Sequence, residues 1–289
     1  MKRHYAVAGG RDEHVPQVPR HRAAFLLNHV YAHRGLHGAG GQQGGPVENS
    51  MPAFRAALDA GYGIECDVHL SADGVAYVIH DAELRRLTGK VGKVSAMTSA
   101  DLSRRELRQD SGPIPRLSEL LALVAGRVPV LIEIKIEPGQ QVGPLCSAVA
   151  WDLRNYAGGE GAAFAPAVIM SFHPDAVRWF RSHAPELVRG LVITEEGRKG
   201  YWHGALRALA MDWARPDFIA YDVRNLSGSF VCRQQRKGRP VLSWTVREPA
   251  QWQAVIEQGA APIFERDAGG NLPAEALAYL EEKRAALHG

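Results

Sequence analysis

Short apolar runs rich in β-branched residues alternate along the chain with longer segments of helical periodicity. This alternation is typical of βα units that build a parallel sheet. Eight runs are predicted as strands: residues 30–33, 64–68, 76–80, 130–135, 167–172, 188–193, 218–222 and 241–246. A ninth run, residues 262–265, competes for the closing position, so the pattern fixes the class of sheet more firmly than the strand count.

Helices are predicted between these strands, and several begin at residues that favour helix starts. The expected starts are Asn49, Ser118, Pro144, Pro174, Trp202 and Pro249. The pattern predicts a (β/α)8 barrel of the TIM type, formed by residues 23–289 after a polar extension over residues 1–22. A doubly wound sheet is the alternative, but the first βα turn has no GxGxxG, and GxxxxGK[ST] is absent from the chain.

Composition narrows the function classes. A chain of 289 residues with 46% hydrophobic residues is an ordinary globular protein, and its formal charge of +3 gives no support for a nucleic-acid partner. A small anionic substrate fits this charge. The three cysteines form no CxxC pair, and there is no apolar run of bilayer length, so we expect a cytoplasmic protein without a transmembrane segment. The oligomeric state is left open.

Two carboxylates stand on one predicted strand. Glu65 and Asp67 alternate with Ile64, Cys66 and Val68, so both acids face the same side of the sheet. Adjacent acids in an apolar strand repel each other and lose hydration unless a cation lies between them. Oxygen ligands favour one hard divalent cation, Mg²⁺ or Ca²⁺. The alternative is a solvated sheet face whose acids have no function.

A second strand repeats this arrangement. Glu133 and Lys135 share one face of an otherwise apolar run. Glu133 is a candidate third metal ligand, and Lys135 offers a cation for an anionic substrate or for the carboxylates. The alternative is a private Glu–Lys ion pair.

Two histidines end predicted strands. His33 and His80 each follow apolar residues directly, and a pair of imidazoles beside a metal-bound substrate can act as general base and general acid. Arg34, next to His33, offers a planar fork for phosphate. The Gly-rich stretch 38–46 is read as a flexible connection rather than a phosphate cradle. The basic cluster at 233–239 is read as a solvated helix end, with a phospholipid headgroup or another polyanion as the alternative.

These motifs resemble those of a known family. The stretches AHRG, ENSMPAF, GYGIECDVHLSADG, VIHDAELRRLTG, IPRLSELL and LIEIK, in this order between Ala32 and Lys135, are similar to the glycerophosphodiester phosphodiesterase family. The resemblance continues more weakly through residues 171–185 and 242–260. It implies a (β/α)8 barrel with a short insertion after the HD strand, over about residues 82–115.

The resemblance also implies residue roles. His33 and His80 would form the acid–base pair, and Glu65, Asp67 and Glu133 would bind one divalent cation, Mg²⁺ or Ca²⁺. The phosphate contacts would come from Arg34 and Lys135. The pocket for glycerol or the leaving alcohol would be lined by Phe172 and Trp244.

The expected reaction is metal-dependent hydrolysis of a glycerophosphodiester, a small molecule, to sn-glycerol 3-phosphate and an alcohol. Water and the glycerol 2-hydroxyl are both candidate nucleophiles, and either histidine could be the base. Two alternatives are a lysophospholipase D-type phosphodiesterase and a non-catalytic, metal-dependent binder of phosphorylated ligands. The chain departs from the family pattern at Arg247, where Asn is common, and over residues 261–267.

Overall fold

The computed structural model describes residues 22–38, 45–156, 166–195, 201–267, 270–276, 278–279 and 281. The predicted extension therefore lies outside the described residues except for Arg22, and so does most of the Gly-rich stretch. Among the described residues, no helix combines the length and the apolar character that crossing a membrane requires.

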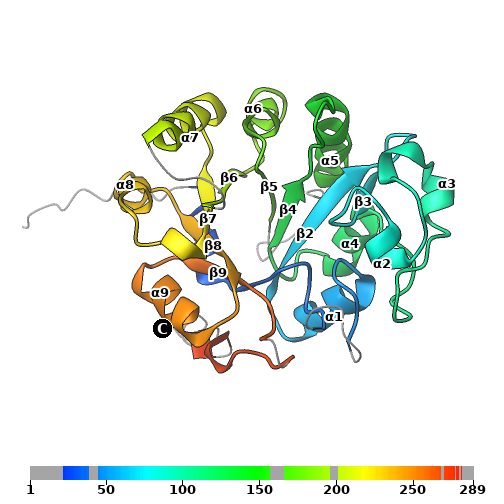
Figure 1. The fold of residues 1–289 in the computed structure, drawn as a ribbon, viewed down its shortest axis with the longest axis horizontal. Coiled ribbons are helices and arrows are strands. Elements are labelled where there is room, and N and C mark those ends of the chain that lie inside the picture. Colours follow the sequence, from blue (N-terminus) through cyan, green and yellow to red (C-terminus); the bar gives the residue numbers. More distant parts are fainter. Residues whose placement is uncertain are drawn as a thin grey trace, which may run out of the picture.

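Eight parallel strands form a closed barrel, which confirms the predicted fold class (Figure 1). The strands are β1 (Tyr31–Ala32), β2 (Gly63–Leu70), β4 (Val130–Ile134), β5 (Ala167–Ser171), β6 (Arg189–Ile193), β7 (Phe218–Asp222), β8 (Val241–Val246) and β9 (Ala261–Phe264). The short strand β1 pairs with both β2 and β9 and so closes the sheet.

One predicted barrel strand lies outside the barrel. Residues 76–80 supply β3 (Ala76–Val78), which pairs antiparallel with β2. Only five residues separate the two strands, whereas a parallel crossover needs about a dozen or more. The ninth apolar run, which became β9, takes the remaining barrel position.

Helices cover the outside of the barrel. The predicted ones are α1 (Met51–Asp59), α4 (Leu117–Val124), α5 (Val142–Tyr156), α6 (Pro174–His183), α7 (Tyr201–Ala214) and α9 (Pro249–Glu257). At the start of α1 the Ser50 hydroxyl accepts a hydrogen bond from the Ala53 amide, so the cap lies one residue after the predicted start at Asn49. The basic cluster belongs to a further helix, α8 (Ser229–Arg236), of which only the end was predicted.

The predicted insertion follows β3 and has an apolar core of its own. It carries α2 (Arg85–Thr88), a 3₁₀ turn (Val94–Ala96) and α3 (Ser99–Leu102). Buried side chains from this segment pack on Tyr77 and Ile79 of the hairpin: Leu84, Leu87, Val94, Leu102, Leu107 and Ile114.

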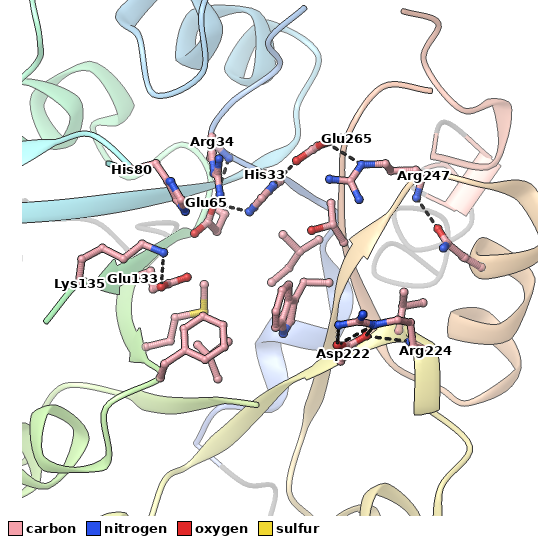
Figure 2. Close-up of a pocket in the computed structure, with 18 residues that line it drawn as sticks. His33, Arg34, Glu65, His80, Glu133, Lys135, Asp222, Arg224, Arg247 and Glu265 are labelled. Atoms are coloured by element: carbon pink, nitrogen blue, oxygen red, sulfur yellow. Dashed lines mark hydrogen bonds and ion pairs between the residues drawn. The ribbon is translucent and has the colours of Figure 1, made fainter. Parts of the chain in front are cut away.

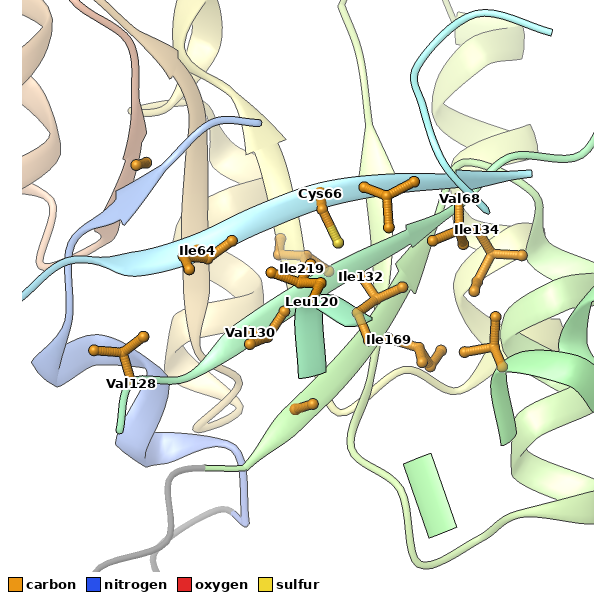
Figure 3. Packing of buried hydrophobic residues seen from close by; sticks show 14 of the residues in the cluster. Ile64, Cys66, Val68, Leu120, Val128, Val130, Ile132, Ile134, Ile169 and Ile219 are labelled. Atoms are coloured by element: carbon orange, nitrogen blue, oxygen red, sulfur yellow. The ribbon is translucent and has the colours of Figure 1, made fainter. Parts of the chain in front are cut away.

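Alternation along the strands separates two environments. The outward side chains of β2 and β4, among them Ile64, Cys66, Val130 and Ile132, are buried beneath the helices (Figure 3). The inward side chains near the amino ends form a second apolar cluster: Tyr31, Leu131, Val168, Phe218, Leu242 and Ile263. A 3₁₀ helix (Ala24–Asn28) covers this end, and the Tyr31 hydroxyl donates to the Leu26 carbonyl at 3.1 Å. The polar inward positions therefore lie at the carboxyl ends.

Candidate active site

A cavity of about 490 Å³ opens at the carboxyl ends of the strands (Figure 2). On three strands, the side chain two residues beyond an apolar interior position points into this cavity. His33 follows Tyr31, Glu133 follows Leu131, and Glu265 follows Ile263. The predicted residues that line the cavity are His33, Arg34, Glu65, His80, Glu133, Lys135, Phe172 and Trp244. Asp67 is fully buried beside them. The structure thus brings all nine predicted residues to one place.

Three carboxylates lie close together at one side of the cavity. Asp67 on β2 is in register with Glu133 on β4, and these two with Glu65 each offer an oxygen within 4.8 Å of the others. Burial, reinforced by Asp67 and Glu133, raises the pKa of Glu65 well above its ordinary value. Burial also raises the pKa of Glu133 to about 7, against the opposing effect of Lys135. Three buried carboxylates at this separation repel one another, and a bound cation would relieve that repulsion.

The carboxylate cluster fits a hard divalent cation. Its donors are all carboxylate oxygens, which Mg²⁺ and Ca²⁺ prefer. Glu65 Oε1 is buried and has no hydrogen-bond partner within the described part of the chain. An unpaired buried carboxylate oxygen loses its hydration without compensation, and coordination to a cation would compensate for that loss.

Two side-chain cations lie against this cluster. Lys135 Nζ is 2.9 Å from Asp67 Oδ1 and 2.5 Å from Glu133 Oε1. Because Lys135 contacts two carboxylates, it does not form an isolated ion pair with Glu133. Arg34 Nε lies 3.1 Å from Asp67 Oδ2, and its guanidinium also contacts Glu48 Oε1 at 2.8 Å. Burial alone would raise the pKa of Asp67, but Lys135 and Arg34 outweigh it and hold that pKa well below its usual range.

The turn after β1 explains why glycine follows Arg34. Arg34 and Gly35 adopt left-handed φ values of 56° and 77°. A Cβ on Gly35 would lie 2.9 Å from the Ala53 carbonyl carbon of α1, so a side chain there would displace the helix. The Asn49 amide donates to the Arg34 carbonyl at 2.9 Å and closes the turn. The backbone thereby directs Arg34 at Asp67.

His33 is oriented by a carboxylate that the sequence did not single out as functional. Its Nδ1 lies 2.5 Å from Glu265 Oε1, and Glu265 in turn accepts from Arg247 Nε at 2.8 Å. The opposite nitrogen, Nε2, is 3.8 Å from Glu65 Oε2. Burial lowers the pKa of His33, and the hydrogen bond to Glu265 opposes that effect. With Nδ1 engaged, Nε2 is the nitrogen available for proton transfer.

His80 lies at the same end of the barrel (Figure 2). Its Nδ1 is 2.8 Å from Asp81 Oδ1, and Arg86 Nε donates to Asp81 Oδ2 at 2.6 Å. Burial lowers the pKa of His80. Both candidate imidazoles therefore have one nitrogen held by a carboxylate that itself pairs with arginine.

Aromatic side chains also line the cavity. Phe172 and Trp244 meet edge to face with ring centroids 5.3 Å apart, and Trp244 Nε1 donates to the Ala220 carbonyl at 3.1 Å. Lys135 Nζ lies 5.8 Å from the centre of the Phe172 ring. The cavity thus joins a charged wall to an apolar one.

Several residues that support the site were not predicted from the sequence. Glu265 and Arg247 orient His33, while Asn49 donates from its side-chain amide to Asp67 Oδ2 at 2.9 Å. The available signal was weak: Glu265 directly follows the closing strand, which is where barrel enzymes carry functional groups.

A closed (β/α)8 barrel with this site defines a barrel enzyme that acts on an anionic substrate. Comparisons with known proteins agree and are more specific. The chain belongs to the glycerophosphoryl diester phosphodiesterase family, whose model matches residues 33–267, so it is a phosphoric diester hydrolase.

The similar proteins include several from bacteria. "Probable glycerophosphodiester phosphodiesterase 1" of Mycobacterium tuberculosis is 30% identical over 89% of this chain and 93% of that protein. "Glycerophosphodiester phosphodiesterase" of Caldanaerobacter subterraneus is 28% identical over 82% and 93%. A match in Bacillus altitudinis, with 37% identity, spans only 46% of that relative. An Oleispira antarctica phosphodiesterase, solved with the product sn-glycerol-3-phosphate, shares the fold with a TM-score of 0.70 at 21% identity, covering 91% of this chain and 99% of that one.

Proposed function

We propose that the chain hydrolyses glycerophosphodiesters to sn-glycerol 3-phosphate and an alcohol, and that the nine clustered residues perform this reaction. The observation that carries the proposal is the meeting of three buried carboxylates, two cationic side chains and two imidazoles at one cavity. Family membership supplies the class of bond. The product bound to the Oleispira antarctica relative supports sn-glycerol 3-phosphate as the product that keeps the phosphate, with the other alcohol as the leaving group.

In this proposal Glu65, Asp67 and Glu133 hold one divalent cation, Mg²⁺ or Ca²⁺. When bound, such a cation contributes positive charge that stabilises the phosphoryl oxygens. Arg34 and Lys135 bind the same oxygens from the protein side, because both already direct their charges at the carboxylate cluster. Stabilisation of developing charge by preorganised groups is commonly the largest part of catalysis.

His33 and His80 exchange the protons. One imidazole takes a proton from the nucleophile, and the other gives a proton to the leaving alkoxide. The nucleophile is water, or it is the glycerol 2-hydroxyl, in which case water opens the resulting cyclic phosphate in a second step. Phe172 and Trp244 form the apolar surface against which the glycerol or the leaving alcohol packs, since both side chains line the cavity.

The direct test is release of sn-glycerol 3-phosphate from glycerophosphocholine by the purified full chain. The assay has arms with EDTA, Mg²⁺ and Ca²⁺, and it compares the wild type with His33→Ala and His80→Ala. We expect release only with a divalent cation and a loss of about 100-fold or more in each variant, because general acid and base catalysis are each worth about 10²–10⁴-fold. Cation-independent release would contradict the metal assignment.

His183→Ala is the matched control, because His183 lies on α6 and stacks on Trp179 with ring centroids 4.5 Å apart, away from the cavity. A lysophospholipid arm tests the first alternative function. Cation binding without turnover of any phosphodiester would support the second alternative, a binder, and would contradict the proposal.

We also propose that the chain works as one barrel domain, residues 23–289, preceded by a polar extension, and that it resides in the cytoplasm. The three cysteines are all free, which supports a reducing compartment. Fractionation of cells that produce the chain tests the location.

A further inference from the structure

Three large apolar side chains lie exposed on the outer face of α7. Leu206, Leu209 and Trp213 have exposed fractions of 61%, 66% and 48%. Their spacing of three and four residues places them on one face of the helix, and we call them the α7 stripe. Trp213 is held in place, because its Nε1 donates to Asp175 Oδ1 at 2.6 Å and the Arg178 guanidinium lies 3.7 Å from its ring centre. A fixed apolar stripe in water indicates an interaction surface.

A strongly basic cleft of about 490 Å³ lies between α7 and α8. Within the described part of the chain, Asp212 is the one acidic residue in its lining. The basic residues that line the cleft are Arg207, Arg215, Arg233, Lys237 and Arg239. This local excess contrasts with a formal charge of only +3 for the whole chain.

Three of the cleft's cations have no carboxylate partner among the residues that the structure describes. Arg207 is paired with Glu195 at 2.7 Å. For Arg215, Arg233 and Lys237, no carboxylate of the described residues comes within the 4.0 Å that defines an ion pair. All three side chains are exposed. A group of uncompensated cations around a concave surface attracts anions of matching size, such as phosphate groups.

We propose that the α7 stripe and the α7–α8 cleft together form a docking surface for an anionic phospholipid bilayer. Apolar side chains beside basic ones are the combination that binds a helix to the surface of an anionic bilayer, and tryptophan favours that interface. The stripe enters the headgroup region while the cleft accepts headgroup phosphates. The stripe lies on the side of α7 next to α6, where Trp213 contacts Asp175 and Arg178, and the cleft lies on the side next to α8, so the surface extends across the outer edge of α7, away from the active-site cavity (Figure 1).

Charge decides between this occupant and a second copy of the chain. In a twofold dimer through the stripe, the apolar side chains of two copies would pair, but the second copy would bring the same basic cleft and would leave the cations of both clefts without a counter-charge. A bilayer with anionic headgroups instead offers both the negative charge and the apolar layer that the surface lacks.

The test is sedimentation of the full chain with vesicles of phosphatidylcholine alone or mixed with phosphatidylglycerol. We expect binding to the anionic vesicles, weakened by salt, and little binding to phosphatidylcholine alone. Arg233→Glu combined with Lys237→Glu should weaken binding by about tenfold or more, because each basic side chain near an anionic surface contributes about fivefold. Leu206→Ser combined with Leu209→Ser should also weaken it by about tenfold.

Lys90→Glu combined with Val91→Ser is the matched control, because these residues of the insertion are exposed, Val91 by 80%, and belong to no part of the surface. Brominated phosphatidylglycerol should quench wild-type tryptophan fluorescence more than that of Trp213→Phe. Circular dichroism melting confirms that every variant folds. Because vesicle binding is measured directly, the outcome does not depend on the enzymatic assay.

The absence of binding to anionic vesicles, or equal binding by all variants, would overturn the proposal. Concentration-dependent self-association that the leucine substitutions abolish, without vesicle binding, would instead make the stripe a protein interface and would also overturn it.

Discussion

At the scale of single residues, His33 depends on two partners distant in sequence. Glu265 accepts from its Nδ1, and Arg247 in turn donates to Glu265. Burial would raise the pKa of Glu265, but His33 and Arg247 outweigh it and hold that pKa well below its usual range, so the carboxylate is charged at neutral pH. A charged acceptor on Nδ1 fixes the tautomer and the ring orientation.

We therefore predict that Glu265→Ala lowers kcat by about 10–100-fold while KM changes by less than about twofold, because both carboxylate oxygens of Glu265 are engaged by His33 and Arg247. Glu265→Gln, which keeps an oxygen acceptor, should retain more activity than Glu265→Ala. Steady-state kinetics with glycerophosphocholine measures both. Glu257→Ala, on the exposed surface of α9, is the control. A rise in KM alone would contradict a positioning role.

Residue by residue, the sequence predicted the site where charge interrupts an apolar strand. Glu65, Asp67, Glu133 and Lys135 stood out because buried strands seldom carry charges. The structure places Glu65, Glu133 and Lys135 at the cavity wall and Asp67 buried directly behind them. Glu265 did not stand out, because its partner His33 lies 232 residues earlier and no local pattern records that contact. Such pairings depend on closure of the barrel, which a linear pattern does not contain.

At the scale of the elements, the barrel interior is packed by matching small residues to large ones. A Cβ on Gly190 of β6 would lie 2.3 Å from Cζ of Phe218, whose ring fills the interior beside β6. Gly190→Ala should therefore lower the free energy of unfolding by about 1–3 kcal/mol through overpacking. Urea denaturation followed by circular dichroism measures this loss.

Gly204→Ala is the control for that substitution, because a Cβ there meets nothing within 4 Å and the residue lies in α7. Alanine in an exposed helix should raise stability by up to about 1 kcal/mol. Equal effects of the two substitutions would contradict the packing argument.

A helix outside the barrel offers a prediction about pH. Burial raises the pKa of Asp152 in α5 to about 6. The unfolded chain then releases this proton at a lower pH than the folded one, so the aspartate weakens the fold as pH rises from about 4 to 6. Asp152→Asn removes the penalty and should stabilise the protein by about 1 kcal/mol above pH 6, after allowance for partial solvent screening.

Thermal melts of wild type and Asp152→Asn at pH 4, 5, 6 and 8 measure this difference. The gain should be largest at pH 8 and should shrink toward zero near pH 4. A gain that is independent of pH would mean that burial of the charge is not its cause.

The elements also show which parts of the fold the sequence could predict. Periodicity located the β strands and the capped helices, because alternation and helix starts are local properties. It placed residues 76–80 in the barrel because a hairpin strand and a barrel strand have the same apolar pattern. Chain length between β2 and β3 distinguishes the two, and that signal was present in the sequence.

At the scale of the whole molecule, the site concentrates opposing charge at the centre of the fold. Glu65, Asp67 and Glu133 come from adjacent strands, and Arg34 and Lys135 balance only two of the three charges. The barrel therefore bears an unfavourable electrostatic energy at its core that a divalent cation would relieve. Cation binding should then stabilise the entire domain, because β2 and β4 hold the ligands and lie in the continuous sheet.

A divalent cation at about 100 times its Kd should add roughly 2.7 kcal/mol to the free energy of unfolding, or roughly 5–10 °C in Tm. Glu65→Gln should reverse the order of the melting temperatures. Without cation the variant should melt above the wild type, because a buried carboxylate beside two others is removed and the amide still accepts from the Arg34 backbone. With cation it should melt below the wild type, because one ligand is lost. Calorimetry in EDTA and in millimolar Mg²⁺ or Ca²⁺ measures the melting temperatures of the wild type and of Glu65→Gln. If the cation raised both melting temperatures by the same amount, it would bind outside this cluster.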